Sequence, residues 1–376
     1  VIFSSLFSCS ITENKIEVID LQCEYLENPL GIDATTPRLS WKLISEENNI
    51  SQKAYHILVA STSENLEKNI GDIWDSEKVI SNQSTQIKYA GSKLRSRQKV
   101  FWKVGVWNQE SDAPVWSEIA TWEMALLKQD DWKAKWIGKD ELTRAEVGEK
   151  NPTMYFRKSF NVNGGIENAR AYITGLGYYE LYINGKKVGD HVLAPNQTNY
   201  DSRQENSFEN GRVANMSTRI LYETFDIGNY LKEGENVAAV ILGNGWYYRT
   251  ERDEFLPMYS NLPRFISQIE IENTDNSKQI IVSDETWKMG TGPIVENSIY
   301  YGEVYDARLE IPNWNLSGFD DNNWENSKVV RTPDGKLRTQ MSEPDRVVDV
   351  IKPVSVTTPN KGIYRFDFGT MFSGWV

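Results

Sequence analysis

The stretch YYELYINGKKVGDHVLAPNQTNYDSR, residues 178–203, joins a β-hairpin to a polar loop. Tyr179, Leu181 and Ile183 alternate with more polar neighbours, which is the two-residue period of a half-buried strand. The Asn-Gly pair at 184–185 then predicts a type I′ turn, because both residue types tolerate the positive φ that this turn requires. The polar residues that follow are not needed for a hairpin, so they become candidates for a binding site.

The composition is that of a globular protein of more than one domain. The chain has 376 residues, of which 39% are hydrophobic and 25% charged, and a single core rarely serves a chain of this length. It has 13 Trp and 18 Tyr. Indole and phenol rings stack on the apolar faces of sugars as well as packing in cores, so this richness favours a carbohydrate-handling protein.

The charge balance excludes one class of partner. With 41 basic and 53 acidic side chains the net charge is −12, which repels phosphate backbones and anionic lipid surfaces. We therefore expect no nucleic-acid partner. The two cysteines, Cys9 and Cys23, are too few for a disulfide framework and lack metal-binding spacing.

The N-terminal sequence VIFSSLFSCS resembles the end of a bacterial lipoprotein signal, with Cys9 as the lipidated residue. Phe7 is bulkier than that pattern prefers, and a short buried strand is the alternative. The signal interpretation makes residues 1–15 a signal remnant and predicts a periplasmic or outer-membrane lipoprotein, or an extracellular protein. No later segment has the ~18 consecutive apolar residues of a membrane helix, so the lipid is the one membrane link that we expect.

Short strand-like runs separated by turn signals predict an all-β protein. Residues 16–125 are expected to form a fibronectin type III-like sandwich, and the polar segment 126–152 a linker. Residues 153–345 are expected to form a jelly-roll sandwich of a carbohydrate-binding kind. Residues 346–376 read as the start of a further β-sandwich.

The run at residues 237–242 is apolar at every position. It predicts a central strand covered by a second sheet, because a strand buried on both faces does not alternate.

Motifs of catalysis are missing from the sequence. It has two histidines, His56 and His191, and no HExxH, GxSxG or phosphate-binding glycine loop. A glycosidase needs two acids held apart across the scissile bond. The doublets Asp130-Asp131 and Asp320-Asp321 are more typical of solvated turns. We assign no catalytic residue, and a ligand role for His191 is the less favoured alternative to a structural one.

Two loops, APNQTNYDSR at residues 194–203 and GNGWYYR at residues 243–249, could meet at one end of the jelly roll and form a sugar site. They would supply polar groups for hydroxyls, rings for stacking, and oxygen ligands for Ca²⁺. The predicted ligand-binding residues are Asn199, Tyr200, Asp201, Arg203, Asn244 and Trp246. The predicted metal ligands are Asn199, Asp201 and Asn244. The alternative roles are turn geometry for the Asn and Asp residues, a structural ion pair for Arg203 and core packing for Trp246.

The ordered series of segments resembles the front half of bacterial α-L-rhamnosidases. The resemblance covers nearly all of residues 23–376 and is carried by NPLGIDATTPRLSWKL, WKAKWIG, YFRKSFNV, GLGYYELYINGKKVGDHVLAPNQTNYDSR, YETFDIGNYLKEGENVAAVILGNGWYY, YYGEVYDAR and FDFGTMFSGWV. Fragments such as YINGKKVG also occur in jelly-roll domains of β-galactosidase-like enzymes, and it is the series in this order that is specific.

The resemblance implies β-sandwich modules ahead of an (α/α)6 barrel that hydrolyses terminal α-linked rhamnose with inversion. The barrel's acids would lie beyond residue 376, so this chain alone is expected to be inactive. In some members the jelly roll binds rhamnose through calcium, which is why Ca²⁺ is the expected cofactor and a rhamnose-containing carbohydrate the expected partner. A stand-alone lectin-like module and a structural spacer are the alternatives, and the oligomeric state is left open.

Overall fold

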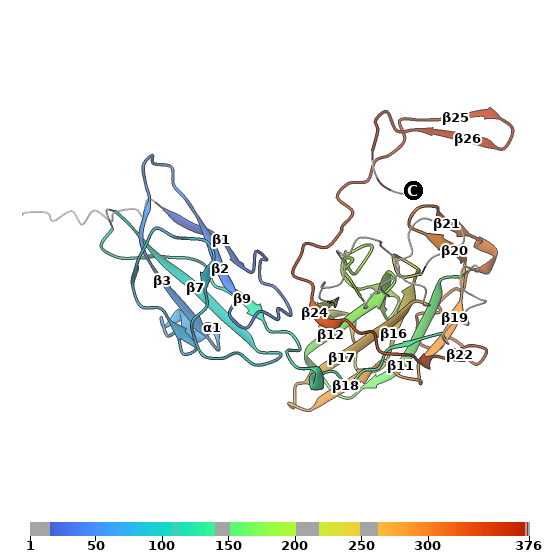
Figure 1. The fold of residues 1–376 in the computed structure, drawn as a ribbon, viewed down its shortest axis with the longest axis horizontal. Helices are drawn as coiled ribbons and strands as arrows, with labels where there is room; N and C mark the ends of the chain where they lie inside the picture. Colours follow the sequence, from blue (N-terminus) through green and yellow to red (C-terminus); the bar gives the residue numbers. More distant parts are fainter. Residues whose placement is uncertain are drawn as a thin grey trace, which may run out of the picture.

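The computed structural model describes residues 16–109, 111–139, 151–200, 218–248, 262–372 and 374. Within them the chain is almost entirely β-structure and forms two sandwiches that lie side by side, with a separate C-terminal hairpin (Figure 1). The all-β prediction is confirmed. None of the helices in these residues is long and apolar enough to cross a bilayer.

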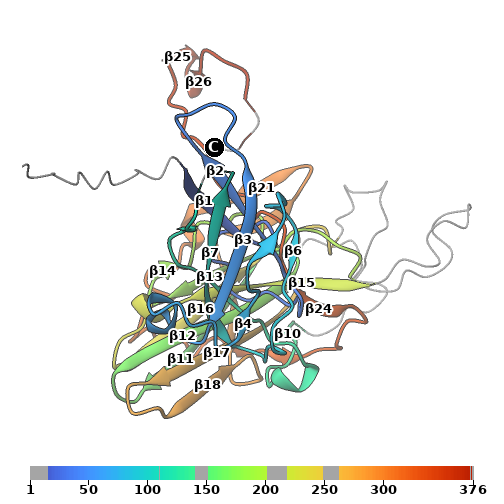
Figure 2. The same ribbon diagram turned by 90° about the vertical axis from the view of Figure 1, so that its left-hand side faces the viewer.

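The first domain is a β-sandwich, as the sequence predicted. One sheet has the order β1-β2-β6, with bounds β1 (Glu17–Cys23), β2 (Arg38–Ile44) and β6 (Ile87–Lys88). The other is built on the neighbouring strands β3 (Gln52–Ala60) and β7 (Lys99–Asn108), visible in Figure 2. Strands β4 (Trp74–Asp75) and β5 (Val79–Ile80) pair with β3, and β8 (Val115–Trp116) and β9 (Ala120–Glu123) pair with β7. Trp41, Trp102 and Trp122 are buried in the core, and the helix α1 (Ser63–Glu67) packs beside β3.

The second sandwich has the jelly-roll form of two packed sheets. One sheet has the order β23-β10-β17-β12-β15-β24, with β18 paired to β17. Its strands are β10 (Ile137–Gly138), β12 (Ile166–Leu176), β15 (Arg219–Asp226), β17 (Arg264–Asn273), β18 (Lys278–Val282), β23 (Lys328–Val329) and β24 (Lys336–Thr339). The other has the order β14-β13-β16-β11-β19-β22. Its strands are β11 (Met154–Val162), β13 (Tyr179–Ile183), β14 (Lys186–Lys187), β16 (Gly234–Leu242), β19 (Lys288–Thr291) and β22 (Glu325–Asn326).

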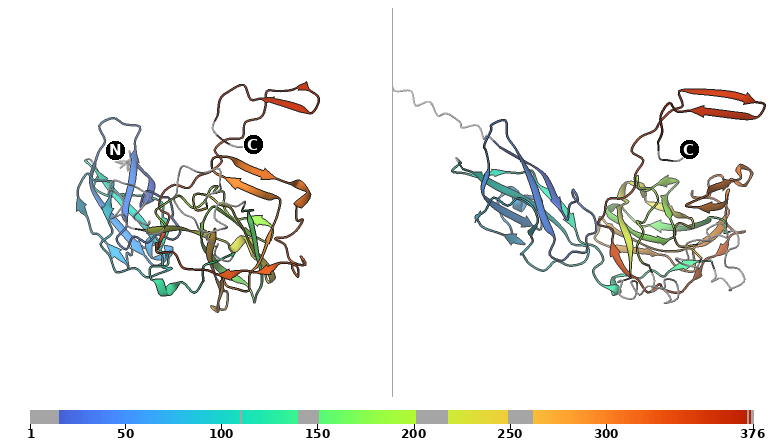
Figure 3. Two further views of the ribbon diagram at one scale, coloured as in Figure 1. Left: turned by 45° about the vertical axis from the view of Figure 1, so that its right-hand side comes forward. Right: turned by 45° about the horizontal axis from the view of Figure 1, so that its top comes forward.

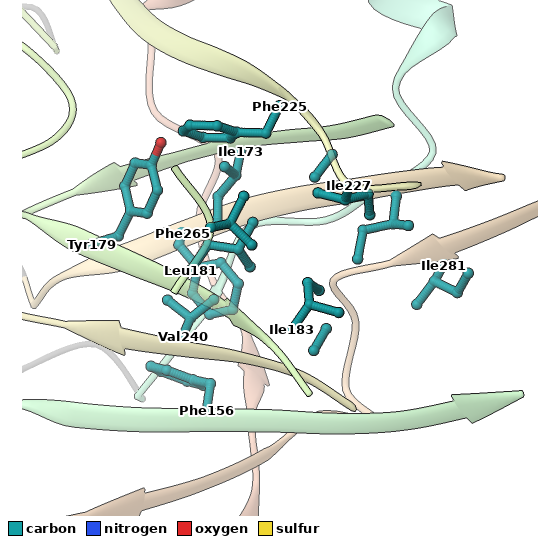
Figure 4. Packing of buried hydrophobic residues seen from close by; sticks show 14 of the residues in the cluster. Phe156, Ile173, Tyr179, Leu181, Ile183, Phe225, Ile227, Val240, Phe265 and Ile281 are labelled. Carbon is teal, nitrogen blue, oxygen red and sulfur yellow. The ribbon is translucent and has the colours of Figure 1, made fainter. Parts of the chain in front are cut away.

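The main core lies between these two sheets (Figure 4). Phe156 and Leu181 project from one sheet and Ile173 and Phe265 from the other. The rings of Phe156 and Phe265 meet edge to face with 4.9 Å between centroids. Such contacts between large buried rings are a main source of the hydrophobic free energy that holds the sheets together.

The hairpin predicted at residues 178–188 is confirmed. Tyr179, Leu181 and Ile183 of β13 are buried, while their alternating neighbours are half-buried. Asn184 has a φ of 50° and Gly185 a φ of 81°, as the type I′ turn requires. The chain returns through β14, and the amide of Val188 donates to the carbonyl of Leu181 at 2.8 Å.

The prediction of a central strand at residues 237–242, covered by a second sheet, is confirmed. Strand β16 is central, between β13 and β11. Its inward residues Ala238, Val240 and Leu242 face the other sheet. Its outward residues Val237 and Ala239 are instead covered by an aromatic loop that includes Trp314 and packs with Phe319 and Trp324.

The linker predicted at 126–152 also differs from the structure. Residues 126–139 are described, and within them β10 pairs with both β17 and β23 of the second sandwich. Ile137 is fully buried in the main core. The run WKAKWIG is therefore part of the second sandwich rather than a free connection.

Two further hairpins lie outside these sheets. Strands β20 (Ile294–Ser298) and β21 (Gly302–Tyr305) pair in one, and β25 (Ser355–Asn360) and β26 (Ile363–Asp367) in the other. Both views of Figure 3 show β25 and β26 set apart from the sandwiches, and all their residues are exposed. The short 3-10 helices η1 (Gln129–Asp131), η3 (Gly228–Tyr230) and η5 (Ala307–Leu309) complete the regular structure of the described residues.

Candidate functional site

The turn that follows β16 is held by a buried network of amide side chains. The amide nitrogen of Asn151 donates to Asn244 Oδ1 at 2.8 Å, and Asn244 Nδ2 donates to the carbonyl of Asn297 at 2.9 Å. The backbone N–H of Asn244 donates to Asn297 Oδ1 at 2.7 Å, and Asn297 Nδ2 donates to Thr153 Oγ1 at 2.8 Å. Asn244 is only 1% exposed. This network fixes where the next residues of the turn point.

Two glycines let this turn approach the turn before β13. A Cβ on Gly177, whose φ is +110°, would lie 2.2 Å from the carbonyl oxygen of Gly243. A Cβ on Gly245, whose φ is +49°, would lie 2.9 Å from the backbone nitrogen of Tyr178. Only glycine permits such contact at positive φ. The close approach brings Tyr178 and Trp246 together.

Three rings form what we call the aromatic edge: Tyr178, Trp246 and Tyr300. The Trp246 indole lies edge to face against Tyr300, with 5.7 Å between ring centroids and 88° between planes. Tyr300, which follows β20, is 57% exposed, whereas Tyr178 and Trp246 are half-buried. Burial raises the pKa of Tyr178, and a hydrogen bond with Trp246 acts in the opposite direction. The edge is thus a fixed set of rings partly open to solvent.

The predicted loops do meet, but through their buried residues. Tyr200 and Tyr247 lie with 6.0 Å between ring centroids, and Tyr200 is 1% exposed. This burial favours the core role for Tyr200 over stacking on a ligand. Asn199 is half-buried, and its carbonyl accepts the amide of Arg219 at 2.9 Å. Asp201 and Arg203 lie outside the described residues.

The described part of the predicted calcium site does not match a cation cradle. Asn244 Oδ1 accepts a hydrogen bond from Asn151 inside the protein, whereas a Ca²⁺ site needs several convergent oxygens. Within the described ranges there is no group of three or more His, Cys, Asp or Glu side chains placed to hold a metal ion. Asn244 is therefore better explained as a structural residue.

Sequence reasoning identified Trp246 but not its two partners. Tyr178 and Tyr300 both begin Tyr-Tyr pairs, in GYYE and IYYGE. This doubling was the available signal: Tyr179 packs while Tyr178 remains accessible, and Tyr300 and Tyr301 are both exposed. No periodicity indicated that the two pairs converge on Trp246, because the convergence depends on the Gly177 contact for Tyr178 and on the Asn244–Asn297 hydrogen bonds for Tyr300.

Models of two domain families match the chain. Residues 18–128 match the Rha78A-like N-terminal immunoglobulin domain, and residues 164–349 match the α-L-rhamnosidase N-terminal domain. An α-L-rhamnosidase of Formosa agariphila is 33% identical over 98% of this chain and 40% of its own length. The chain belongs to the α-L-rhamnosidase family. It corresponds to the N-terminal β-sandwich portion of that family.

Other α-L-rhamnosidases support the same assignment. One from an Alteromonas species is 35% identical over the whole of this chain and 40% of its own length. The structure of α-L-rhamnosidase from Dictyoglumus thermophilum superposes with a TM-score of 0.82 and 39% identity, over 96% of this chain and 39% of that one. The Aspergillus terreus enzyme gives a TM-score of 0.78 and 30% identity over 94% of this chain and 38% of that one. The chain spans about 40% of the length of the two curated relatives from Formosa agariphila and Alteromonas.

Proposed function

We propose that this chain is the substrate-handling front portion of a secreted α-L-rhamnosidase that removes terminal α-L-rhamnose with inversion. The family assignment supports the reaction class, and the curated relatives are more than twice as long as the matched region. The two acids of such a reaction would come from the remainder of the protein. Within this chain the role is to bind or position the rhamnoside.

The aromatic edge is the observation that carries the binding role. Rhamnose has a methyl group and an apolar ring face, which suit Trp246 and Tyr300, and hydroxyls that a phenol such as Tyr178 can bind. Few hydrogen bonds and an open site imply weak affinity, on the order of 0.1–1 mM, because each net hydrogen bond contributes little and binding costs freedom of motion.

The test is isothermal titration of L-rhamnose into the chain, its Trp246→Ala variant and its Tyr300→Ala variant. We expect weak binding that is reduced in both variants. Tyr364→Ala is the matched control, because Tyr364 is similarly exposed but lies on β26. Binding that both edge variants retain in full would contradict the site.

We propose calcium binding separately. Asp201 is the one carboxylate among the predicted calcium ligands, so it is the residue to test. Repeating the titration with Ca²⁺ and then with chelator tests it. Loss of rhamnose binding in chelator, and in Asp201→Asn, would support a calcium-dependent site. Equal rhamnose affinity with Ca²⁺ and with chelator would mean that the three rings of the aromatic edge bind the sugar without calcium.

Secretion and membrane attachment are proposed from the N-terminal sequence. A lipid on Cys9 would place the protein in the periplasm, on the outer membrane or outside the cell. The mass of the native protein, measured intact, distinguishes a lipidated and cleaved terminus from an unmodified one. An unmodified, uncleaved terminus would contradict the anchor.

A lectin-like module is the second candidate, and the same aromatic edge favours it. The two candidates differ in what the native gene product does. A product that binds rhamnose but does not hydrolyse rhamnosides would favour the lectin. A chain that binds no sugar would favour the structural spacer.

A further inference from the structure

A cleft of about 510 Å³ lies between the two sandwiches, and none of the three rings of the aromatic edge lines it. One wall comes from the first sandwich, from Gln22 near the end of β1 and from residues 25–30 after it. The other comes from His191, from the end of β15 and from residues 340–346 of the second. Its volume is within the range of roughly 300–1,000 Å³ of small-molecule sites, which often lie at domain interfaces.

A strained turn places an aromatic ring in the first wall. The amide of Cys23 donates to the carbonyl of Leu26 at 2.9 Å and the amide of Leu26 donates back at 3.0 Å, which makes Glu24 and Tyr25 the two central residues. Their φ values are 53° and 68°. Asn and Gly normally occupy such positions, and positive φ is strained for larger residues. Backbone strain of this kind collects at ligand-binding places.

Side chains beside the strained turn position the Tyr25 ring. Glu24 accepts hydrogen bonds from the guanidinium of Arg38, with Nη2 to Oε2 at 2.5 Å, and that guanidinium lies 5.1 Å from the Tyr25 ring centroid. Gln86 Nε2 donates to the Tyr25 hydroxyl at 2.6 Å. Yet the residue is 51% exposed. An immobilised and exposed ring lets a ligand stack without ordering a mobile side chain.

The opposite wall presents the His191 ring, which is positioned by the buried Glu223. Glu223 is 5% exposed; it accepts the Tyr179 hydroxyl and lies 2.5 Å from His191 Nδ1. Figure 4 shows the Tyr179 hydroxyl directed toward the part of the core where Phe225 lies. The other ring nitrogen of His191 faces Arg346 Nη2 at 3.2 Å.

Most of the charged side chains that line the cleft already have partners, and Glu27 is the exposed exception. Glu223 is in hydrogen-bond contact with His191 and Tyr179, Asp226 pairs with Arg170 at 2.9 Å, and Arg346 pairs with Asp190 at 3.0 Å. A charged ligand would therefore have to compete with existing ion pairs and lose hydration. A neutral ligand rich in hydroxyls could share these polar groups and place its apolar face on Tyr25.

We propose that this interdomain cleft is a separate saccharide-binding site, with Tyr25 as its stacking ring. It is independent of the aromatic edge, and it gives the tandem of two sandwiches a binding surface that neither has alone. Two weak sites on one chain would hold a polysaccharide more tightly than either does singly.

The test compares four proteins by isothermal titration and saturation-transfer NMR with L-rhamnose and with D-galactose: the parent chain, Tyr25→Gly, Trp246→Ala and the double variant. Glycine adopts the strained turn readily, so Tyr25→Gly should unfold at the same urea concentration as the parent or a higher one. Its cleft affinity should fall about tenfold or more. Trp246→Ala should keep the cleft signal, and the double variant should lose all binding.

Each outcome bears on one site. If Trp246→Ala abolishes all sugar binding, or if Tyr25→Gly binds both sugars as the parent does, the cleft proposal is overturned. If Tyr25→Gly alone abolishes all binding, the cleft stands and the aromatic edge fails. Binding of inorganic phosphate or spermidine, but of neither sugar, that Tyr25→Gly removes would assign the cleft to a charged ligand and overturn the proposal.

Discussion

Arg170 of β12 and Glu123 of β9 form a buried ion pair that joins the two sandwiches. The guanidinium donates to both carboxylate oxygens, at 2.9 Å from Nε to Oε1 and 2.8 Å from Nη2 to Oε2. In a second pair the first sandwich supplies the cation instead: Arg97 pairs with Glu270 of β17 at 2.5 Å. Buried pairs contribute little net free energy but are costly to break on one side only, so they favour one relative orientation of the sandwiches.

We expect Arg170→Leu to lower the free energy of unfolding by about 3–5 kcal/mol, because Glu123 would stay buried without its cation. Urea denaturation is the measurement. Replacing both residues by leucine should recover much of the loss. Glu285→Gln is the control, since its pair with Lys135 is exposed at 60% and 52%, and it should change stability by less than about 1 kcal/mol. A small effect of Arg170→Leu would contradict the proposed role of this pair.

We expect Asp321→Asn to lower the unfolding free energy by about 1.5–3 kcal/mol, the worth of a hydrogen bond to a charged group. Asp321 pairs with the buried Arg157, which also donates to the carbonyl of Trp314 at 2.8 Å. The pair thereby anchors the aromatic loop over β16. Asp320→Asn, one residue away and exposed, should change stability by less than about 0.5 kcal/mol. Equal effects of the two variants would refute this anchoring role.

Asn244→Ala should act on stability rather than directly on sugar binding. It would leave Asn151 Nδ2 and the carbonyl of Asn297 without their partner, at a cost of about 1–3 kcal/mol. Thermal unfolding measures the loss, with the exposed Asn322→Ala as a control. Unchanged stability together with lost rhamnose binding would instead restore Asn244 as a ligand residue.

The interdomain contact should weaken in acid. Burial tends to raise the pKa of Asp131, but hydrogen bonds from Ser96, the Lys128 amide and Arg97 outweigh it, and the pKa is lowered. A lowered folded-state pKa stabilises the fold above the unfolded value of about 4 and loses that contribution as pH falls through the folded one. Asp131→Asn should therefore make the unfolding free energy depend less steeply on pH in that acidic range. If the unfolding free energy of Asp131→Asn depends on pH as steeply as that of the parent, the ionisation of Asp131 does not contribute to this acid sensitivity.

The chain by itself should not hydrolyse a chromogenic α-L-rhamnoside. It corresponds to the N-terminal sandwiches, and inverting hydrolysis needs two separated acids across the sugar ring. Release of the chromophore is the measurement. Turnover that survives repurification would place the catalytic acids within these residues.

Local sequence patterns predicted the strands well. The alternation of Tyr179, Leu181 and Ile183 and the Asn-Gly turn appear in the structure as predicted, because period and turn chemistry act between near neighbours. The same patterns placed Ile137 in a linker, since a short polar-flanked run does not reveal the strands with which it pairs. Asp321 looked solvated because its partner, Arg157, is 164 residues away in the sequence.

The sequence by itself determined the all-β class, the family and the residue types available for binding. The tertiary structure decided which of those residues face solvent. Tyr200 and Asn244 are buried by contacts from distant strands. Tyr178 reaches Trp246 because Gly177 allows two turns to touch, and Tyr300 lies against Trp246 where the Asn244–Asn297 hydrogen bonds join β20 to the turn after β16. The cleft with Tyr25 exists only because the two sandwiches dock, and Arg170 with Glu123 is one of the contacts between them. Side-chain exposure is a property of the packed molecule, so neighbours in the sequence cannot specify it.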